Sequence, residues 1–281
     1  MKIMQKIAIG FIRLKFKVLA AFSKKIAAEK AFQLFCTPSA KPIKKMPAIF
    51  EKAELINFKF DELTIQGYRW NHPQQHKVLI IHGFNSAAYK FSYYIEAFIK
   101  KGYEVLAFDA PAHGNSEGKT TNALKYSEMI KKVIELYGPI NNFMAHSFGG
   151  LALCLALENN IDDQNTKLVF IAPATETTSA IDTALSMLHL KNIEVRKEFD
   201  KVIFNASGKP TEWFSMKRSL QNINAKILWF HDEADDTTPV KDVLKIKEEN
   251  LPNIQFIITK GLGHRKIYYD AEVKKQVVDF L

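Results

Sequence analysis

The sequence predicts an α/β fold, in which helices flank a mostly parallel β-sheet. Three short apolar runs, at residues 77–81, 103–108 and 142–146, indicate buried strands, and a segment with helical periodicity follows each one. Because parallel strands need a crossover connection, this alternation favours a parallel sheet with helices on both faces. The chain has 281 residues, 47% of them apolar, which is enough for one such core and an insertion.

Further strands and helices complete the predicted sheet. An antiparallel pair of strands is expected at residues 55–60 and 63–70, at one edge. Helices are expected at residues 87–101, 123–137 and 148–158. The remaining elements are strands at residues 167–172, 226–230 and 254–259 and helices at residues 240–249 and 271–281.

The alternation stops between residues 174 and 225. This segment has helical pieces but no clear strand, and it is too long for an ordinary connection. We therefore expect a helical cap at residues 174–225, inserted into a main domain of residues 51–173 and 226–281. Its large apolar side chains either line an apolar pocket or pack on the sheet: Leu185, Met187, Leu188, Leu190, Phe204, Trp213 and Phe214.

Residues 1–50 are expected to form a separate arm, because their charge differs from that of the rest. The net charge is +9, yet the first 45 residues hold eleven Lys or Arg residues against one acid, so the remainder is nearly neutral. Pro38, Pro42 and Pro47 form a semi-rigid connector. Apolar residues three or four positions apart predict one amphipathic helix: Ile3, Ile7, Phe11, Leu14, Val18 and Phe22.

Two interpretations of this arm stay open. In the first, residues 1–36 lie in the interface of an anionic membrane, with the apolar stripe among acyl chains and the lysines near headgroups. In the second, the stripe packs on the domain. A nucleic-acid partner is not expected, because the body is nearly neutral and only 5 of the 39 cationic residues are Arg, the residue best suited to bidentate phosphate contact.

Cysteine usage and hydropathy favour a cytoplasmic protein, peripheral at the inner face of the membrane if the arm binds there. Cys36 and Cys154 are expected to be reduced. Basic residues interrupt every apolar run before it reaches the length of a membrane span, and they interrupt the N-terminal run before it resembles a secretory signal. No spacing of His, Cys or carboxylates argues for a metal, and no cofactor is expected.

The strongest chemical signal is the segment at residues 142–150. It combines an apolar strand, a turn of small residues around Ser147 and an apolar helix. Such a turn strains the serine and makes its hydroxyl project from the carboxyl edge of the sheet, and it needs small residues two positions away, here Ala145 and Gly149. Taken alone, the pattern also fits an ordinary serine at a helix N-cap.

A glycine turn after the first parallel strand supplies a second part of the site. The backbone N–H of Phe84, together with that of Phe148 after the serine, is placed to stabilise the oxyanion of a tetrahedral intermediate. The alternative is a tight turn that simply needs Gly83. Three histidines at strand ends are expected to fix loops by hydrogen bonds: His82, His146 and His231.

A serine nucleophile needs a base, and the base needs a carboxylate that orients it. Two glycines precede His264 after the last strand, Gly261 and Gly263, and they let the loop fold back over the sheet edge, so His264 is the expected base. Asp235 is the preferred acid, and Glu176 is a more distant candidate. Four acids compete after the strand at residues 226–230: Asp232, Glu233, Asp235 and Asp236.

From about residue 55 to its end, the chain resembles the α/β-hydrolase superfamily of serine hydrolases. The resemblance rests on the strand order, the His-Gly-Phe turn, the serine elbow, the late acid and the Gly-x-Gly-His motif at residues 261–264. Residues 108–116 also resemble the loop after the fourth strand of that family, in which Asp109 and His113 are expected to shape the loop. The arm lies outside the resemblance. Residue by residue, the resemblance implies Ser147 as nucleophile, Asp235 as orienting acid, His264 as base and Phe84 and Phe148 as oxyanion donors.

The expected activity is hydrolysis of carboxylic esters of small to medium apolar substrates through an acyl-serine intermediate. The same triad supports cleavage of thioesters or amides. A membrane-docked binding module with a silent triad is the non-enzymatic alternative. Because the base must be neutral to accept a proton, activity is expected to fall below about pH 6 to 7.

Overall fold

The computed structural model describes residues 3–39, 45–159 and 165–281, with the side chains of residues 3–8 left out. By its contacts, the chain divides into two compact units. Unit 1 comprises Met1–Thr37 and Glu176–Phe214, and unit 2 comprises Pro38–Thr175 and Ser215–Leu281. The sheet lies in unit 2. None of the helices in the described residues is long and apolar enough to cross a membrane.

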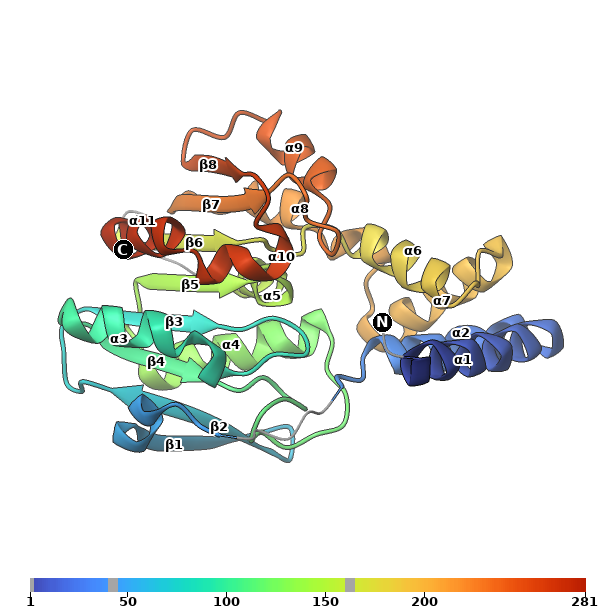
Figure 1. Cartoon of the computed structure of the whole chain (residues 1–281), viewed down its shortest axis with the longest axis horizontal. Coiled ribbons are helices and arrows are strands. Elements are labelled where there is room, and N and C mark those ends of the chain that lie inside the picture. Colours follow the sequence, from blue (N-terminus) through green and yellow to red (C-terminus); the bar gives the residue numbers. More distant parts are fainter. Residues whose placement is uncertain (1–2, 40–44, 160–164) are drawn as a thin grey trace. The chain divides into compact units, whose positions relative to one another are not determined.

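Eight strands of the described residues form one sheet in the order β1-β2-β4-β3-β5-β6-β7-β8 (Figure 1). The pairs β1–β2 and β2–β4 are antiparallel, and all other neighbours are parallel. The strands are β1 (Glu54–Phe60), β2 (Leu63–Trp70), β3 (Lys77–Ile81), β4 (Glu104–Phe108), β5 (Asn142–His146), β6 (Lys167–Ile171), β7 (Lys226–Asp232) and β8 (Ile254–Thr259). The predicted fold class, a mostly parallel sheet with an antiparallel edge pair, is confirmed.

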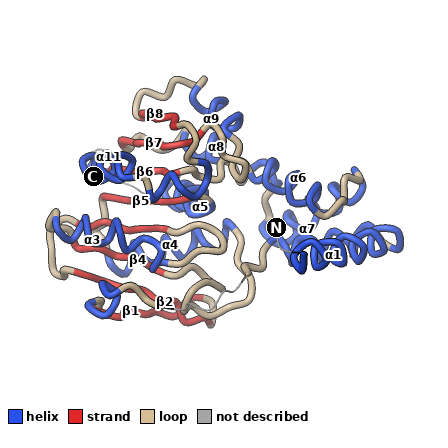
Figure 2. The backbone as a smooth tube through the Cα atoms, viewed as in Figure 1, coloured by secondary structure: helices blue, strands red, loops and turns tan. Residues whose placement is uncertain are grey.

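Helices cover both faces of this sheet (Figure 2). On one face, α3 (Ser92–Lys100) and α11 (Ala271–Phe280) share a buried core with β3, β4, β5 and β7. On the other face, α4 (Ala123–Tyr137) packs beside α5 (Phe148–Leu157), and α5 contacts α8 (Met216–Leu220). The other described helices of unit 2 are η1 (Ala48–Lys52), η2 (Ala88–Phe91), α9 (Val240–Lys247), α10 (Gly263–Lys266) and η5 (Ile267–Tyr269).

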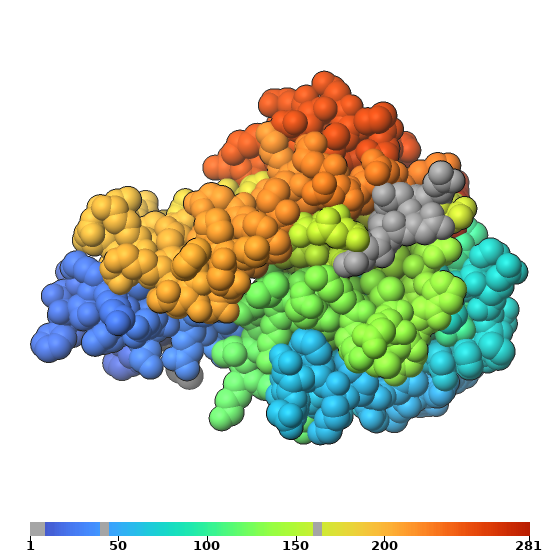
Figure 3. Space-filling view, turned by 180° about the vertical axis from the view of Figure 1, so that it is seen from behind, coloured from blue at the N-terminus to red at the C-terminus, as the bar shows by residue number. Residues whose placement is uncertain are grey.

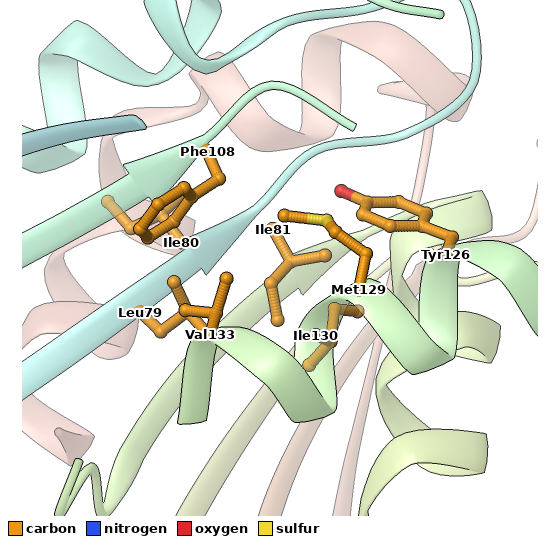
Figure 4. Close-up of a pocket in the computed structure, with 8 residues that line it drawn as sticks. All are labelled: Leu79, Ile80, Ile81, Phe108, Tyr126, Met129, Ile130 and Val133. Carbon is orange, nitrogen blue, oxygen red and sulfur yellow. The ribbon is translucent and has the colours of Figure 1, made fainter. Parts of the chain in front are cut away.

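A small apolar cavity lies between α4 and strands β3 and β4 (Figure 4). The one hydroxyl among its lining side chains, that of Tyr126, donates a hydrogen bond to the carbonyl of His82 at 3.1 Å. The cavity therefore belongs to the core and has no reactive group. Its lining consists of Leu79, Ile80, Ile81, Phe108, Tyr126, Met129, Ile130 and Val133.

For two predicted elements of unit 2 the structure shows why the bounds differ from those expected. The strand expected at residues 226–230 continues to Asp232, because His231 and Asp232 still pair with β8. The helix expected at residues 87–101 starts as a 3-10 turn, η2, before α3 begins at Ser92. The carboxylate of Asp109 accepts a hydrogen bond from the N–H of Ala88 at 2.8 Å, and this bond holds the turn.

Unit 1 is formed by helices from two distant parts of the chain, which lie side by side (Figures 1 and 3). They are α1 (Ile3–Phe22), α2 (Lys24–Phe35), α6 (Thr177–Met187), α7 (Ile193–Ser207) and η4 (Thr211–Trp213). The second arm helix, α2, was not predicted. The Ser23 hydroxyl caps it by accepting a hydrogen bond from the N–H of Ile26 at 3.3 Å.

Small and aromatic side chains join the arm to α7. Ala27, Ala28 and Ala31 of α2 are buried, which lets the two helix backbones approach closely. Phe32 of α2 meets the ring of Phe199 edge-on, with the ring centroids 5.7 Å apart. The arm is therefore integrated with residues of the expected insertion. By contrast, α8, which also lies within residues 174–225, belongs to unit 2.

The apolar stripe of α1 does not pack on the protein. Phe11, Leu14, Val18 and Phe22 are 71%, 60%, 60% and 90% exposed, and we call these four residues the α1 stripe. The packed side of the helix carries Phe16 and Ala20, which are buried. The interpretation in which the stripe packs on the domain is wrong for these four residues, and the side chains of Ile3 and Ile7 lie outside the described residues.

Candidate active site

The turn at Ser147 connects the end of β5 to the start of α5. Its backbone has φ 55° and ψ −127°, a strained conformation that non-glycine residues rarely adopt. The N–H of Ser147 donates to the carbonyl of Ile171 at 3.2 Å, and its carbonyl accepts from the N–H of Ala174 at 3.0 Å. Strand β6 and the segment after it thus hold the strained residue in place.

Two glycines make room for this turn. A Cβ on Gly149 would lie 2.4 Å from the carbonyl oxygen of His82, so only glycine lets α5 start this close to the end of β3. A Cβ on Gly83 would lie 2.8 Å from the Cβ of Ser147. The Gly83 turn and the serine elbow are therefore fitted against each other.

Phe84 directly follows Gly83 and Phe148 directly follows Ser147, so their backbone N–H groups lie next to the close approach of Gly83 and Ser147. Phe148 is the first residue of α5, where an N–H has no acceptor within the helix and the helix dipole is positive. Neither N–H donates to a protein acceptor within the described residues. The two phenyl rings meet edge-on with centroids 5.6 Å apart, and both are partly exposed.

The structure brings Ser147, His264 and Asp235 into one chain of hydrogen bonds. The Nε2 atom of His264 lies 2.9 Å from the Oγ atom of Ser147, and its Nδ1 atom lies 2.8 Å from the Oδ2 atom of Asp235. His264 is the second residue of the one-turn helix α10 and not part of an open loop. The preceding backbone turns through Gly261 and Gly263, both at positive φ.

Asp235 is held as a charged acceptor. Its Oδ1 atom accepts hydrogen bonds from the N–H groups of Thr237 and Thr238 at 2.9 and 2.8 Å. Burial opposes ionisation, but the hydrogen bond from His264 and these N–H groups outweigh it, so the pKa of Asp235 is lower than usual. A carboxylate that stays ionised favours the His264 tautomer with its proton on Nδ1.

Sequence reasoning missed Thr238. Its Oγ1 atom donates to the Oδ2 atom of Asp235 at 2.8 Å and lies 3.1 Å from the Nδ1 atom of His264. Its carbonyl accepts a hydrogen bond from the Nε2 atom of His231 at 2.7 Å. The signal was present in the sequence, since Asp and Thr residues in a tight turn commonly bond one another's backbone.

The competing acids have other partners. Asp232 is buried at the end of β7, where its Oδ2 atom accepts from the hydroxyl of Thr259 at 2.7 Å. Glu233 and Asp236 are exposed. Glu176 is the N-cap residue of α6 and belongs to unit 1. Among Asp232, Glu233, Asp235 and Asp236, only Asp235 forms a hydrogen bond with His264 in the described residues.

Four histidines near the site are structural. His82 accepts at Nε2 from the N–H of Ala110 at 2.9 Å, and His146 donates from Nε2 to the carbonyl of His264 at 3.2 Å. Burial lowers the pKa of His82 to about 4, that of His146 to about 3 and that of His113 to about 4. His231 is fixed by its bond to Thr238. Within the described residues, no cluster of His, Cys, Asp and Glu has the arrangement of a metal site.

Comparisons with known proteins find similar sequences. A family model described as serine aminopeptidase, S33, matches residues 72–207. The Mycoplasma pneumoniae protein named "Putative esterase/lipase 2" is 22% identical over 238 residues, which cover 70% of this chain and 85% of that protein.

Solved structures share the fold. The Pyrococcus furiosus esterase Pf2001 superposes with a TM-score of 0.66 at 19% identity, covering 87% of this chain and 98% of the esterase. The thioesterase domain from the curacin biosynthetic pathway superposes with a TM-score of 0.58 at 16% identity, covering 80% of this chain and 99% of that domain.

The sheet, the strained serine and these matches together define the class of the protein. The chain belongs to the α/β-hydrolase superfamily. Within that superfamily it is a hydrolase of the esterase/lipase-like kind.

Proposed function

We propose that this protein is a serine hydrolase that cleaves carboxylic esters through an acyl-serine intermediate. The observation that carries the proposal is the 2.9 Å contact between Nε2 of His264 and Oγ of Ser147, with Asp235 bonded to the opposite side of the imidazole. A serine hydroxyl is a weak nucleophile by itself, and this arrangement supplies the base that it needs.

The first half of the reaction forms the acyl-serine. The Oγ atom of Ser147 attacks the ester carbonyl carbon while its proton moves to Nε2 of His264. The carbonyl oxygen becomes an oxyanion and accepts hydrogen bonds from the N–H groups of Phe84 and Phe148. The tetrahedral intermediate then collapses, the bond to the alcohol oxygen breaks, and His264 gives its proton to the departing alcohol.

The second half releases the acid. A water molecule gives one proton to His264, its oxygen attacks the acyl carbon, and the same two N–H groups stabilise the second oxyanion. The proton on His264 returns to Ser147 as the acid leaves. Throughout, the carboxylate of Asp235 stabilises the imidazolium without taking its proton.

An apolar substrate group is supported by the partly exposed rings of Phe84 and Phe148, which carry the two N–H groups. The names of the matched Mycoplasma pneumoniae and Pyrococcus furiosus proteins support an ester substrate. A cytoplasmic location stays a prediction.

Turnover of a panel of p-nitrophenyl esters and acyl thioesters of different chain lengths tests this function. We expect ester hydrolysis that the substitution Ser147→Ala abolishes and that Ser186→Ala, a change in α6 of unit 1, leaves intact. Turnover of thioesters alone would reassign the substrate class. Absence of Ser147-dependent turnover on every member of the panel would contradict the proposal.

A further inference from the structure

The α1 stripe is an apolar surface that the described protein leaves open. Phe11, Leu14, Val18 and Phe22 follow one another at spacings of three, four and four, so they lie on one side of the helix. Phe16 and Ala20, which are buried against the rest of unit 1, lie on the opposite side. The helix is therefore already anchored to the protein by one side and presents four large apolar side chains on the other.

Cationic residues surround the stripe. By helical spacing, Lys15 and Lys17 flank it on its two sides, and both are exposed. Lys25, near the start of α2, is also exposed. None of these three lysines forms an ion pair with a carboxylate in the described residues.

The charge of unit 1 is concentrated in the arm. Residues 1–37 contain eight Lys or Arg residues and a single acid, Glu29. The other part of unit 1, residues 176–214, contains five Lys or Arg residues and six acids. Positive charge thus gathers on the arm, whose first helix, α1, carries the stripe.

We propose that the α1 stripe docks on the surface of an anionic lipid bilayer. An apolar stripe bordered by lysines matches the interface between acyl chains and anionic headgroups, where the apolar side chains insert and the ammonium groups stay at headgroup level. A second copy of the chain is a poorer occupant, because pairing two stripes would bring two strongly cationic arms together. Because α1 is already a helix packed through Phe16 and Ala20, binding orders no new helix.

Sedimentation with vesicles tests the proposal on the full-length protein. We expect partitioning onto vesicles of equimolar phosphatidylcholine and phosphatidylglycerol, weaker partitioning onto pure phosphatidylcholine, and loss of binding as salt rises. A stripe variant with Gln at Phe11, Leu14, Val18 and Phe22 should bind about tenfold more weakly or worse. Replacing Lys15, Lys17 and Lys25 with Gln should weaken binding roughly five-fold for each charge removed.

The matched control replaces exposed apolar residues of unit 2, Leu55 and Leu244, with Gln, and it should bind as the unchanged protein does. Circular dichroism and thermal unfolding check that every variant is folded. Equal partitioning of the folded stripe variant and the unchanged protein would overturn the proposal. Failure of the unchanged protein to bind the anionic vesicles would also overturn it. In that case, analytical ultracentrifugation that finds the unchanged protein as a dimer and the stripe variant as a monomer would identify a second copy as the occupant.

Discussion

The Ser147 site and the α1 stripe differ in the burial and the hydrogen bonding of their side chains. At the site, each member of the triad is buried or nearly so and has a hydrogen-bond partner at 2.8 to 2.9 Å. On the stripe, four large apolar side chains are more than half exposed and have no protein neighbour to cover them in the described residues. The side chains of the Ser147 site find their partners within the folded chain, whereas those of the α1 stripe can be covered only by another molecule.

The largest expected effect concerns the Ser147 site. Asp235→Asn keeps the shape of the side chain but removes the charge that fixes the His264 tautomer, so kcat should fall about 10⁴-fold. Steady-state kinetics on the best ester of the panel measures it. Asp236→Asn, the matched change at the exposed neighbouring acid, should leave kcat within a factor of two. Equal losses in the two variants would show that Asp235 has no special role.

The two sides of α1 provide a direct contrast within one helix. Phe16→Ala removes a ring that is 4% exposed and should lower the free energy of unfolding by about 3 kcal/mol. Phe22→Ala removes a ring that is 90% exposed and should change it by less than about 0.5 kcal/mol. Urea unfolding measures both. A similar cost for both variants would mean that the stripe is covered in solution.

The buried histidines predict that acid weakens unit 2. His82, His113 and His146 have lowered pKa values of about 4, 4 and 3, so the folded state keeps them neutral while the unfolded chain takes up protons below about pH 6.5. Stability should therefore be fully present above that pH and decline as pH falls toward 4. Between pH 7 and pH 5 we expect a loss of about 1 to 2 kcal/mol for each histidine. Urea unfolding measures the free energy of unfolding at both pH values, and equal values would refute this prediction.

A substitution at Thr238 should have the smallest effect of the changes considered. Thr238→Val removes the hydroxyl that donates to Asp235 while the backbone N–H bond remains, so kcat should fall about tenfold with little change in KM. Because the carboxylate then loses a donor, the acid limb of the pH–rate profile should also move. Thr237→Val is the control, since the hydroxyl of Thr237 bonds exposed Asp236. An unchanged pH profile would leave Thr238 with a merely structural role.

The sequence predicted the sheet more fully than the arm, for physical reasons. Strands β3, β5 and β8 and helix α4 begin and end where predicted, because continuous apolar runs bounded by turn residues leave few alternatives. The convergence of Ser147, Asp235 and His264 followed from their positions after parallel strands, which all end at one sheet edge. The sequence around Asp235 indicated a tight turn of Asp and Thr residues, but it did not say which hydroxyl reaches Asp235, because that depends on the path of the turn.

The arm shows the limit of periodicity as a signal. A stripe of apolar residues indicates one face of a helix, but it does not say whether that face is the packed one. In α1 the packed face is carried by Phe16 and Ala20, and the more regular stripe faces outward. Helix α2 escaped prediction because its buried residues are alanines, which leave little contrast with the polar face.

The most direct test of the central claim is the rate at which a fluorophosphonate probe labels Ser147, followed by mass spectrometry of the labelled peptide. If His264 activates Ser147 through the 2.9 Å contact, the unchanged protein should be labelled at Ser147 alone, and His264→Ala should slow labelling by several orders of magnitude. Labelling of a folded His264→Ala variant at the rate of the unchanged protein, or labelling at another residue, would contradict the account.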